Sequence, residues 1–205
     1  MILNEDYFLN EDVCFLAKNL LGKMLITKID NFYTSGIIVE TEAYRGPDDK
    51  ASHSYLNKIT PRNTTMYNHG GCSYVYICYG VHYLFNVVTA PADKAHAVLV
   101  RAIEPIEGIE IMMKRRSHAT FQNTITKGPG SLSMAFGINK LHNNILLHKV
   151  NSTIQIHDIQ KNYLESEIDQ STRIGVESAG ESALWPWRFF IKDSKFVSAH
   201  KKSSN

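Results

Sequence analysis

Apolar residues recur at helical and at strand periods along the chain, and these periods predict most of its elements. Residues 10–22 carry a helical apolar stripe, with Asn10 suited to the N-cap and Gly22 to a left-handed C-terminal cap. Residues 24–29 and 36–44 have the pattern of two strands separated by a polar turn, so we expect them to pair as a hairpin.

The later part of the chain alternates between further strands and two predicted helices. Residues 72–88 are rich in aromatic and β-branched residues, and Tyr79-Gly80 near their centre predicts two short strands with Tyr79 near the tip. A helix over 104–116 is expected to hold Pro105 in its first turn, and a glycine-rich turn from residue 127 opens a short helix. Further strands are expected at 96–103, 153–159, 173–176 and 187–191.

Two carboxylates lie inside the otherwise apolar strand at 36–44. Because side chains alternate along a strand, Ile38, Glu40, Glu42 and Tyr44 are expected to share one face, and the opposite face is apolar or small. An unpaired buried carboxylate costs several kcal/mol, so these acids need partners or a function. From this stretch alone, salt-bridged surface glutamates on an edge strand are the simpler interpretation.

Arg101 presents the complementary problem in the predicted strand at 96–103. A buried arginine is rare unless it is paired with a carboxylate. Glu40 and Glu42 are the obvious partners, because they are the acids that the pattern places inside a strand. We therefore expect the two strands to be neighbours.

Several flat side chains are candidates for a slot near these charges. Tyr44, His53 and Tyr76 could gather there, since the turn at Gly46-Pro47 allows the following loop to bring His53 back to the strand end. Tyr79 would protrude from its hairpin. A carboxylate that activates water beside an aromatic slot suits hydrolysis of a bond to a flat ring, and stacking contributes about 1–3 kcal/mol per base.

Composition narrows the class of protein. The 205 residues, 43% of them hydrophobic, can bury one core, and the apolar runs are too short to cross a membrane. Residues 1–10 lack the pattern of a signal peptide. The three cysteines are an odd number and include no C-x-x-C pair, which favours a reduced intracellular protein. The nine histidines show no metal-binding spacing, so we expect no metal. A net charge of +2 permits a polyanion partner without requiring one.

Taken in order, the segments of the chain resemble the alkyladenine (3-methyladenine) DNA glycosylase family. The resemblance runs from about the first helix to near the C-terminus, and that many ordered segments make it specific. The matching segments are Val39-Glu-Thr-Glu-Ala-Tyr44, Gly46-Pro47-Asp48, Ala51-Ser-His-Ser54, Thr60-Pro-Arg-Asn63, Tyr74-Val-Tyr-Ile-Cys-Tyr-Gly80 with Asn86, Val98-Leu-Val-Arg-Ala-Ile-Glu-Pro105, Gly128-Pro-Gly-Ser-Leu132, Arg173-Ile-Gly-Val176 and Trp187-Arg-Phe-Phe190.

The resemblance implies a role for each matching residue. Glu42 would be the general base for the attacking water, which Arg101 and a backbone carbonyl near Val176 would help to hold. Asn86 would disfavour guanine, and Glu40 would be structural. Tyr44, His53 and Tyr76 would wall the base pocket, while Tyr79 would fill the vacated base stack.

The resemblance also implies the fold and the partners. It implies an α+β fold with a curved, mostly antiparallel, open-barrel-like sheet, a protruding β-hairpin and flanking helices. We expect one domain over residues 1–205, with a frayed tail from about residue 200. The expected substrate is double-stranded DNA with alkylated or deaminated purines. We expect a cytoplasmic, nucleoid-associated monomer that repairs DNA by base excision without a cofactor.

Phosphate contacts must be local, because the net charge is modest. The candidates are Arg62, Lys127, Lys114, Arg115 and Arg116. Val81 and His82 are smaller than the residues beside the wedge in mammalian members, which leaves the wedge geometry open. Two alternatives stay open at this point: a non-catalytic lesion-binding module and a hydrolase of free nucleosides.

Overall fold

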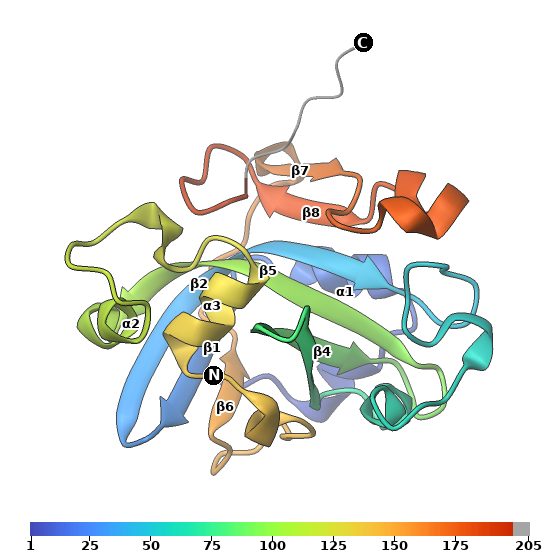
Figure 1. The fold of residues 1–205 in the computed structure, drawn as a ribbon, viewed down its shortest axis with the longest axis horizontal. Coiled ribbons are helices and arrows are strands. Elements are labelled where there is room, and N and C mark those ends of the chain that lie inside the picture. Colours follow the sequence, from blue (N-terminus) through green and yellow to red (C-terminus); the bar gives the residue numbers. More distant parts are fainter. Residues whose placement is uncertain (199–205) are drawn as a thin grey trace.

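The computed structural model describes residues 1–198, and the frayed tail expected from about residue 200 lies outside these residues. Figure 1 shows the arrangement of the strands and helices. The strands are β1 (Met24–Ile29), β2 (Phe32–Tyr44), β3 (Ser73–Cys78), β4 (His82–Thr89), β5 (His96–Glu107), β6 (Ile154–His157), β7 (Ile168–Ser171) and β8 (Arg188–Ile191). The α-helices are α1 (Val13–Asn19), α2 (Ile109–Arg115) and α3 (Pro129–Phe136). Short 3-10 helices are η1 (Glu5–Leu9), η2 (Tyr55–Asn57), η3 (Thr64–Tyr67), η4 (Asn123–Ile125), η5 (Lys140–His142), η6 (Glu165–Glu167) and η7 (Glu177–Leu184).

The strands form one eight-stranded antiparallel sheet in the order β3-β4-β5-β2-β1-β6, with β7 and β8 attached beside β2. The long strand β2 pairs with β5 along one edge. Its other edge pairs first with β1 and then, at residues 40–42, with β8. The α+β fold with a mostly antiparallel open sheet is therefore confirmed, and so is the β1–β2 hairpin.

Two β-bulges interrupt the β2–β5 ladder beside the predicted acids. Ile38 lies opposite Ile103 and Glu40 lies opposite Ala102, so that Val39 is the extra residue on β2. Thr41 then lies opposite Val100, which leaves Arg101 as the extra residue on β5. Bulges re-aim side chains, and here one of them falls on the arginine. The expectation that Ile38 shares the face of Glu40 is wrong, because the inserted Val39 breaks the alternation.

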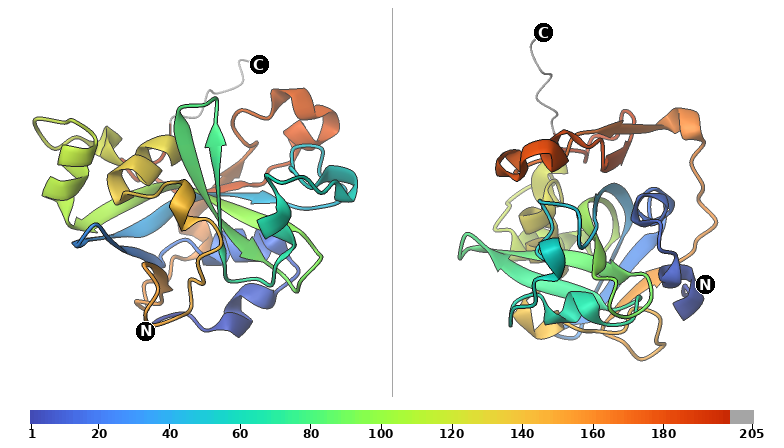
Figure 2. Two further views of the ribbon diagram at one scale, coloured as in Figure 1. Left: turned by 60° about the horizontal axis from the view of Figure 1, so that its bottom comes forward. Right: turned by 90° about the vertical axis from the view of Figure 1, so that its right-hand side faces the viewer.

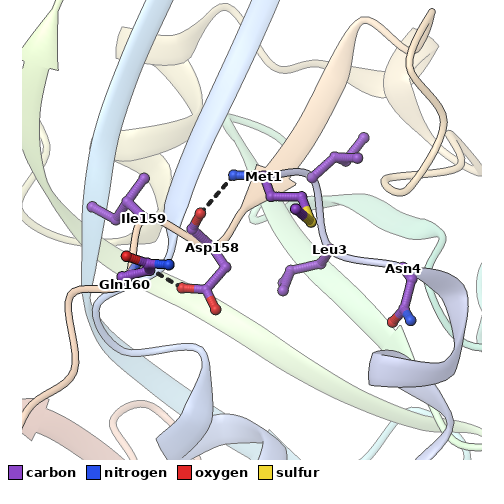
Figure 3. Close-up of a pocket in the computed structure, with 7 residues that line it drawn as sticks. Met1, Leu3, Asn4, Asp158, Ile159 and Gln160 are labelled. Atoms are coloured by element: carbon purple, nitrogen blue, oxygen red, sulfur yellow. Dashed lines mark hydrogen bonds between the residues drawn. The ribbon is translucent and has the colours of Figure 1, made fainter.

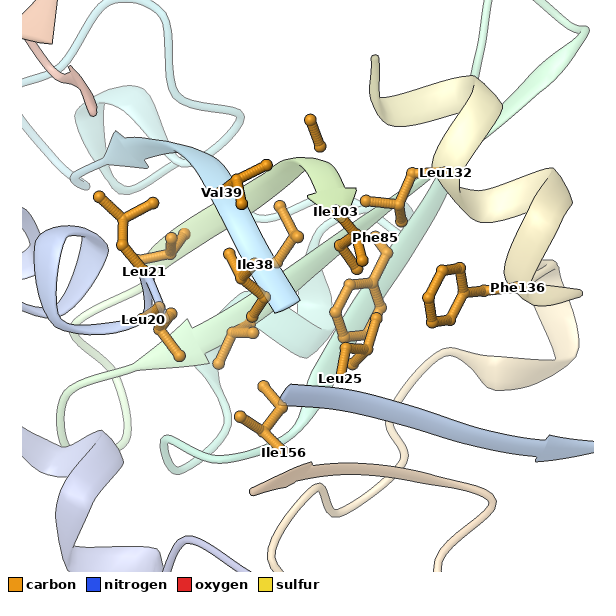
Figure 4. Close-up of a cluster of buried hydrophobic side chains, with 14 of the residues drawn as sticks. Leu20, Leu21, Leu25, Ile38, Val39, Phe85, Ile103, Leu132, Phe136 and Ile156 are labelled. Atoms are coloured by element: carbon orange, nitrogen blue, oxygen red, sulfur yellow. The ribbon is translucent and has the colours of Figure 1, made fainter. Parts of the chain in front are cut away.

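The apolar stripes of the helices and strands meet in one main core. Figure 4 shows Leu20 and Leu21 at the end of α1 and Leu132 and Phe136 of α3 converging on the sheet. Phe85 of β4 is fully buried in the same cluster. The core fixes the sheet from which the candidate site is built.

The β3–β4 hairpin projects from the body of the protein, as Figure 2 shows. Its turn contains Tyr79 and Gly80, with φ angles of 51° and 71°. A left-handed pair of this kind matches the twist of a tight hairpin. The predicted pair of short strands with Tyr79 at the tip is confirmed.

Some predicted boundaries are wrong for reasons that lie in tertiary contacts. The N-cap of α1 is Asp12, whose carboxylate accepts the N–H groups of Cys14 and Phe15, and Asn10 instead accepts the N–H of Asp12. Pro105 lies in β5 opposite Gly36, so that strand pairing extends β5 and delays α2. Residues 173–176 form no strand, and β7 was not predicted.

Among residues 1–198, every helix is too short or too polar to cross a membrane.

The core makes a direct prediction for stability. Leu25 of β1 is fully buried, so Leu25→Ala should lower the free energy of unfolding by about 2–5 kcal/mol through lost burial and a cavity. Urea denaturation measures this change. Leu141→Ala is the control, because Leu141 is 83% exposed and its loss should change stability by less than about 0.5 kcal/mol. Equal losses in both variants would contradict the assignment of the core.

Candidate active site

One row of opposed residues crosses four neighbouring strands and forms the floor of the site. Glu42 on β2 lies opposite Leu99 on β5, and Leu99 lies opposite Asn86 on β4. Asn86 in turn lies opposite Tyr74 on β3. Opposed residues in a ladder share a face of the sheet. Residues far apart in the sequence are thus brought together by strand pairing.

Glu42 is fully buried, and three groups contact its carboxylate. The N–H of Ile174 donates to Oε1 at 2.8 Å, and Nη1 of Arg101 lies 3.2 Å from the same oxygen. The hydroxyl of Tyr44 donates to Oε2 at 2.7 Å. These contacts supply the partners that a buried carboxylate requires.

Glu40 belongs to a separate, more enclosed part of the same network. Its Oε1 accepts Nε of Arg101 at 2.8 Å and Nε of Arg188 at 2.7 Å, and its Oε2 accepts the N–H of Ser198 at 2.8 Å. Burial opposes ionisation of Glu40, but the two guanidinium groups outweigh it and hold the pKa of this carboxyl below its ordinary value. The pairing of Arg101 with both acids is confirmed, and the interpretation of the acids as surface salt bridges is wrong.

Arg188 was missed from the sequence, although the signal that identified Arg101 was present. It is a fully buried cation at the start of the short apolar strand β8, opposite Glu42 in the β2–β8 ladder. Arg173 was missed as well. Its guanidinium donates to both carboxylate oxygens of Asp49, at 2.5 and 2.8 Å, and to the carbonyls of Ala43 and Ser182.

Arg173 therefore anchors the segment that carries two predicted site residues. The next residue, Ile174, donates its N–H to Glu42, and Val176 lines the cleft described below. The Arg173 guanidinium also lies 4.7 Å from the ring centroid of Tyr44. One buried ion pair thus holds both a backbone donor and an aromatic wall in place.

An open cleft of about 450 Å³ lies over this floor. Glu42 lies behind the cleft surface, covered by neighbours that do line it. The lining includes Tyr44, His53, Arg62, Tyr76, Tyr79, Leu99, Arg101, Ile174 and Val176. The structure therefore brings together the predicted wall residues, the arginine and the wedge around one opening.

Besides Tyr44 of β2, the aromatic residues of the cleft come from β3 and from the loop that returns after β2. The rings of His53 and Tyr76 lie 4.6 Å apart in an edge-to-face arrangement. Nδ1 of His53 lies 2.8 Å from the Tyr74 hydroxyl. The expected return of His53 to the strand end is confirmed.

Asn86 lines a smaller inner cavity of about 30 Å³, together with Tyr44, His53 and Tyr76. Its side-chain amide donates to the carbonyls of Tyr74 and Leu84 at 3.0 and 3.3 Å. This geometry satisfies the hydrogen-bond partner that a buried Asn86 needs. It places the residue at the depth of the pocket, behind the aromatic wall.

Tyr79 is 93% exposed at the tip of the projecting hairpin. A large aromatic residue held outside any core has no packing role in the free protein. Arg62 supports the hairpin from the side, because it donates to the carbonyl of Ile77 at 2.7 Å and lies 4.8 Å from the ring centroid of Tyr76.

The other cationic candidates differ in how they are held. Arg115 donates to the carbonyls of Ala135 and Ile29, both at 3.2 Å, and Nη1 of Arg116 lies 3.6 Å from the sulfur of Met134. Lys127 donates to the carbonyl of Lys195 at 3.3 Å. Lys114 is exposed at the end of α2. Their contact with phosphate stays a prediction.

A second pocket, of about 500 Å³, lies at the N-terminus (Figure 3). The backbone carbonyl of Asp158 accepts the terminal amine of Met1 at 2.7 Å, and the carboxylate of Asp158 is paired with Lys23 at 3.0 Å. This pocket has volume but no converging set of acids, bases and aromatic rings. The chemistry is concentrated in the cleft, and no cluster suited to a metal ion occurs within residues 1–198.

The fold and the cleft define a single-domain protein with a buried carboxylate under an aromatic opening and a projecting tyrosine beside it. A family model described as methylpurine-DNA glycosylase matches residues 7–195. A protein of Chlamydia felis (strain Fe/C-56), named "Putative 3-methyladenine DNA glycosylase", is 48% identical over 199 residues, which cover 96% of this chain and all of the relative. A Clostridium botulinum (strain Alaska E43 / Type E3) protein with the same name is 40% identical over 205 residues, covering 97% of this chain and 99% of the relative.

The chain belongs to the methylpurine-DNA glycosylase family. It is therefore an N-glycosylase, an enzyme of DNA repair whose substrate is damaged DNA. The enzyme class predicted from the sequence is confirmed. Family membership also decides against a non-catalytic binding module and against a hydrolase of free nucleosides.

The state of His53 gives a prediction for this site. Burial and, secondarily, the charge of Arg62 lower the pKa of His53 from 6.5 to about 4, so its ring should be neutral at physiological pH. The neutral His53 ring should make its full contribution to the free energy of unfolding above pH 6.5, the ordinary histidine pKa. That contribution should be lost as the pH decreases from 6.5 toward 4. An NMR titration of the His53 ring should have its midpoint near pH 4.

Arg62→Gln is the control for this titration. Removing the cation should raise the midpoint of His53, because one of the two causes of the shift is lost. A titration midpoint of His53 close to 6.5 in the unmodified protein would contradict the prediction that this ring is neutral at physiological pH.

Proposed function

We propose that this protein removes alkylated and deaminated purines, of the 3-methyladenine, 7-methylguanine and hypoxanthine class, from double-stranded DNA. The observation that carries the proposal is the carboxylate of Glu42, held by Arg101 directly behind an aromatic cleft. The base leaves and an abasic site remains. The relatives named above carry 3-methyladenine in their names, which supports the substrate class.

In the proposed reaction, Glu42 takes a proton from a water molecule whose oxygen bonds to C1′ of the flipped nucleotide. The bond between C1′ and the purine nitrogen breaks, and its electron pair goes to the base. A cationic alkylated purine leaves as a neutral molecule, so it needs little further help. The anionic carboxylate also stabilises the positive charge that develops on the sugar.

Arg101 has two roles in this proposal. It pairs with Glu42 and, with the backbone at Val176, helps to hold the water. Glu42 is fully buried in the free protein, so water reaches it past Tyr44, Arg101 and Ile174, which line the cleft. Catalytic hydrogen bonds often tighten only in the substrate complex.

The walls of the cleft suit a flat, charged base. Tyr44, His53 and Tyr76 would receive the flipped purine, and a neutral His53 would avoid repulsion of a cationic one. Asn86, deeper in the pocket, would disfavour guanine through its exocyclic amino group. Discrimination by one such contact is worth about 1–3 kcal/mol, so the pocket would select lesions by the sum of several contacts.

No lysine lines the cleft within the described part of the chain, so the proposal includes no Schiff-base step and no strand cleavage. The enzyme would be monofunctional, without a cofactor. It would act as a monomer in the cytoplasm, on the nucleoid, with phosphate contacts from Arg62, Lys127 and the Lys114–Arg116 cluster.

Replacement of the proposed base tests the reaction. Glu42→Gln keeps the shape and most hydrogen bonds of the side chain but cannot accept the proton of water. The variant should fold and bind damaged duplex DNA, while base release falls by at least about 100-fold. Chromatography of free bases from duplexes that each carry one lesion measures release and also defines the lesion range.

Glu107→Gln is the matched control, because Glu107 is exposed at the end of β5 and away from the cleft. Its release of 3-methyladenine should equal that of the unmodified enzyme. Release by Glu42→Gln at a near-normal rate would remove Glu42 from the proposed role.

The exposed hairpin tip gives a separate prediction. Tyr79→Ala should weaken action on duplex DNA, because no side chain would fill the gap that the flipped base leaves. Release from a lesion in single-stranded DNA should change much less, since no base stack has to be filled. Rates measured on both substrates test this difference, and an equal loss on both would refute a wedge role.

A further inference from the structure

The two oxygens of Glu42 are not equivalent in the structure. Oε1 accepts the Ile174 N–H and lies beside Nη1 of Arg101. Within residues 1–198, Oε2 accepts one hydrogen bond, from the hydroxyl of Tyr44 at 2.7 Å. Each carboxylate oxygen offers about two lone-pair positions. Oε1 therefore has one hydrogen-bond donor and a guanidinium cation beside it, whereas Oε2 has one donor and keeps a position for another hydrogen.

Tyr44 is held in place by more than its hydroxyl. The guanidinium of Arg173 packs against its ring, and the bidentate pair with Asp49 fixes that guanidinium. Burial, and then the neighbouring Glu42, raise the pKa of Tyr44 well above its ordinary range. The hydroxyl thus stays protonated at physiological pH and remains a donor to Oε2.

We infer that Tyr44 is a positioning residue as well as a wall of the base pocket: its hydroxyl fixes the rotation of the Glu42 carboxylate so that Oε2 is the oxygen that takes the proton of water. This inference rests on the proposed function, because it assigns the proton transfer to one atom of the proposed base. Tyr44 acts here through Glu42, and its ring contacts the base separately.

The proton balance follows from this assignment. The water oxygen bonds to C1′, the bond from C1′ to the purine nitrogen breaks toward the base, and the proton of water goes to the open lone pair of Oε2. The Tyr44 hydroxyl keeps its own proton throughout. The Ile174 N–H holds Oε1 and the Arg101 guanidinium lies beside it, and both contacts oppose rotation of the carboxylate during the transfer.

Tyr44→Phe tests the inference, because it keeps the ring and removes only the hydroxyl. In single-turnover reactions with saturating enzyme on duplex DNA containing 3-methyladenine, the rate constant of base release should fall about 10- to 100-fold, the scale of a misplaced catalytic group. The dissociation constant for the same DNA should change less than about threefold, since stacking is retained. A purely structural wall would give the opposite split.

A double-mutant cycle shows whether Tyr44 acts through Glu42. In the Glu42→Gln background, where no proton is taken, Tyr44→Phe should cause no further loss of rate. Additive losses would contradict the inference. Tyr33→Phe, at the exposed β1–β2 turn, controls for removal of a tyrosine hydroxyl and should leave the rate unchanged.

Folding is checked by thermal unfolding, and all rates are measured well below the midpoint of each variant. If Tyr44→Phe does not fold, Tyr44→Trp supplies a second aromatic side chain without the hydroxyl, for which the same loss of rate is expected. A near-normal rate in a folded variant that lacks the hydroxyl would overturn the inference. If Glu42→Gln also retained activity, the proposed function itself would fail, so the two failures are distinguishable.

Discussion

The site depends on the placement of one buried guanidinium between two buried carboxylates. Arg101 lies 2.8 Å from Glu40 and 3.2 Å from Glu42, and both acids are fully buried. Burial of a lone carboxylate is costly, and at Glu40 the charges of Arg101 and Arg188 together outweigh that cost and lower its pKa. A bulge on β5 places this arginine, and with it the charge that the rest of the site requires.

The two acids are held differently, and the difference separates structure from chemistry. Glu40 is enclosed by Arg101, Arg188 and the backbone of Ser198. Glu42 faces neighbours that line the cleft, and it keeps one oxygen with a single donor. The first acid fixes the arginine, and the second is the one that the proposed reaction uses. The buried ion pairs of Glu40 thus position Arg101 beside Glu42, while one oxygen of Glu42 stays able to accept a proton.

The sequence was sufficient for the features that depend on local pattern. Two acids in one apolar strand and an arginine in another predicted an ion pair between the strands, because a buried charge needs a partner of opposite charge. A glycine after a tyrosine between two aromatic strands predicted the exposed hairpin tip. The same reasoning, applied to Arg188 in its apolar strand, could have found the second partner of Glu40.

Features set by distant pairing could not be predicted in this way. Pro105 has the local pattern of a helix start, but pairing with β2 keeps it in a strand. Residues 173–176 resemble a strand, yet the ion pair between Arg173 and Asp49 holds them in irregular backbone that donates to Glu42. Such contacts join segments more than 100 residues apart, and no local period records them.

The most direct test of the account is a crystal structure of Glu42→Gln bound to duplex DNA that contains one 3-methyladenine or a stable analogue of it. The damaged base should lie in the cleft between Tyr44, His53 and Tyr76, with Tyr79 in the vacated stack. A single water molecule should lie between C1′ of the damaged nucleotide and the side chain of residue 42. A base that remains stacked in the duplex, or that binds outside this cleft, would contradict it.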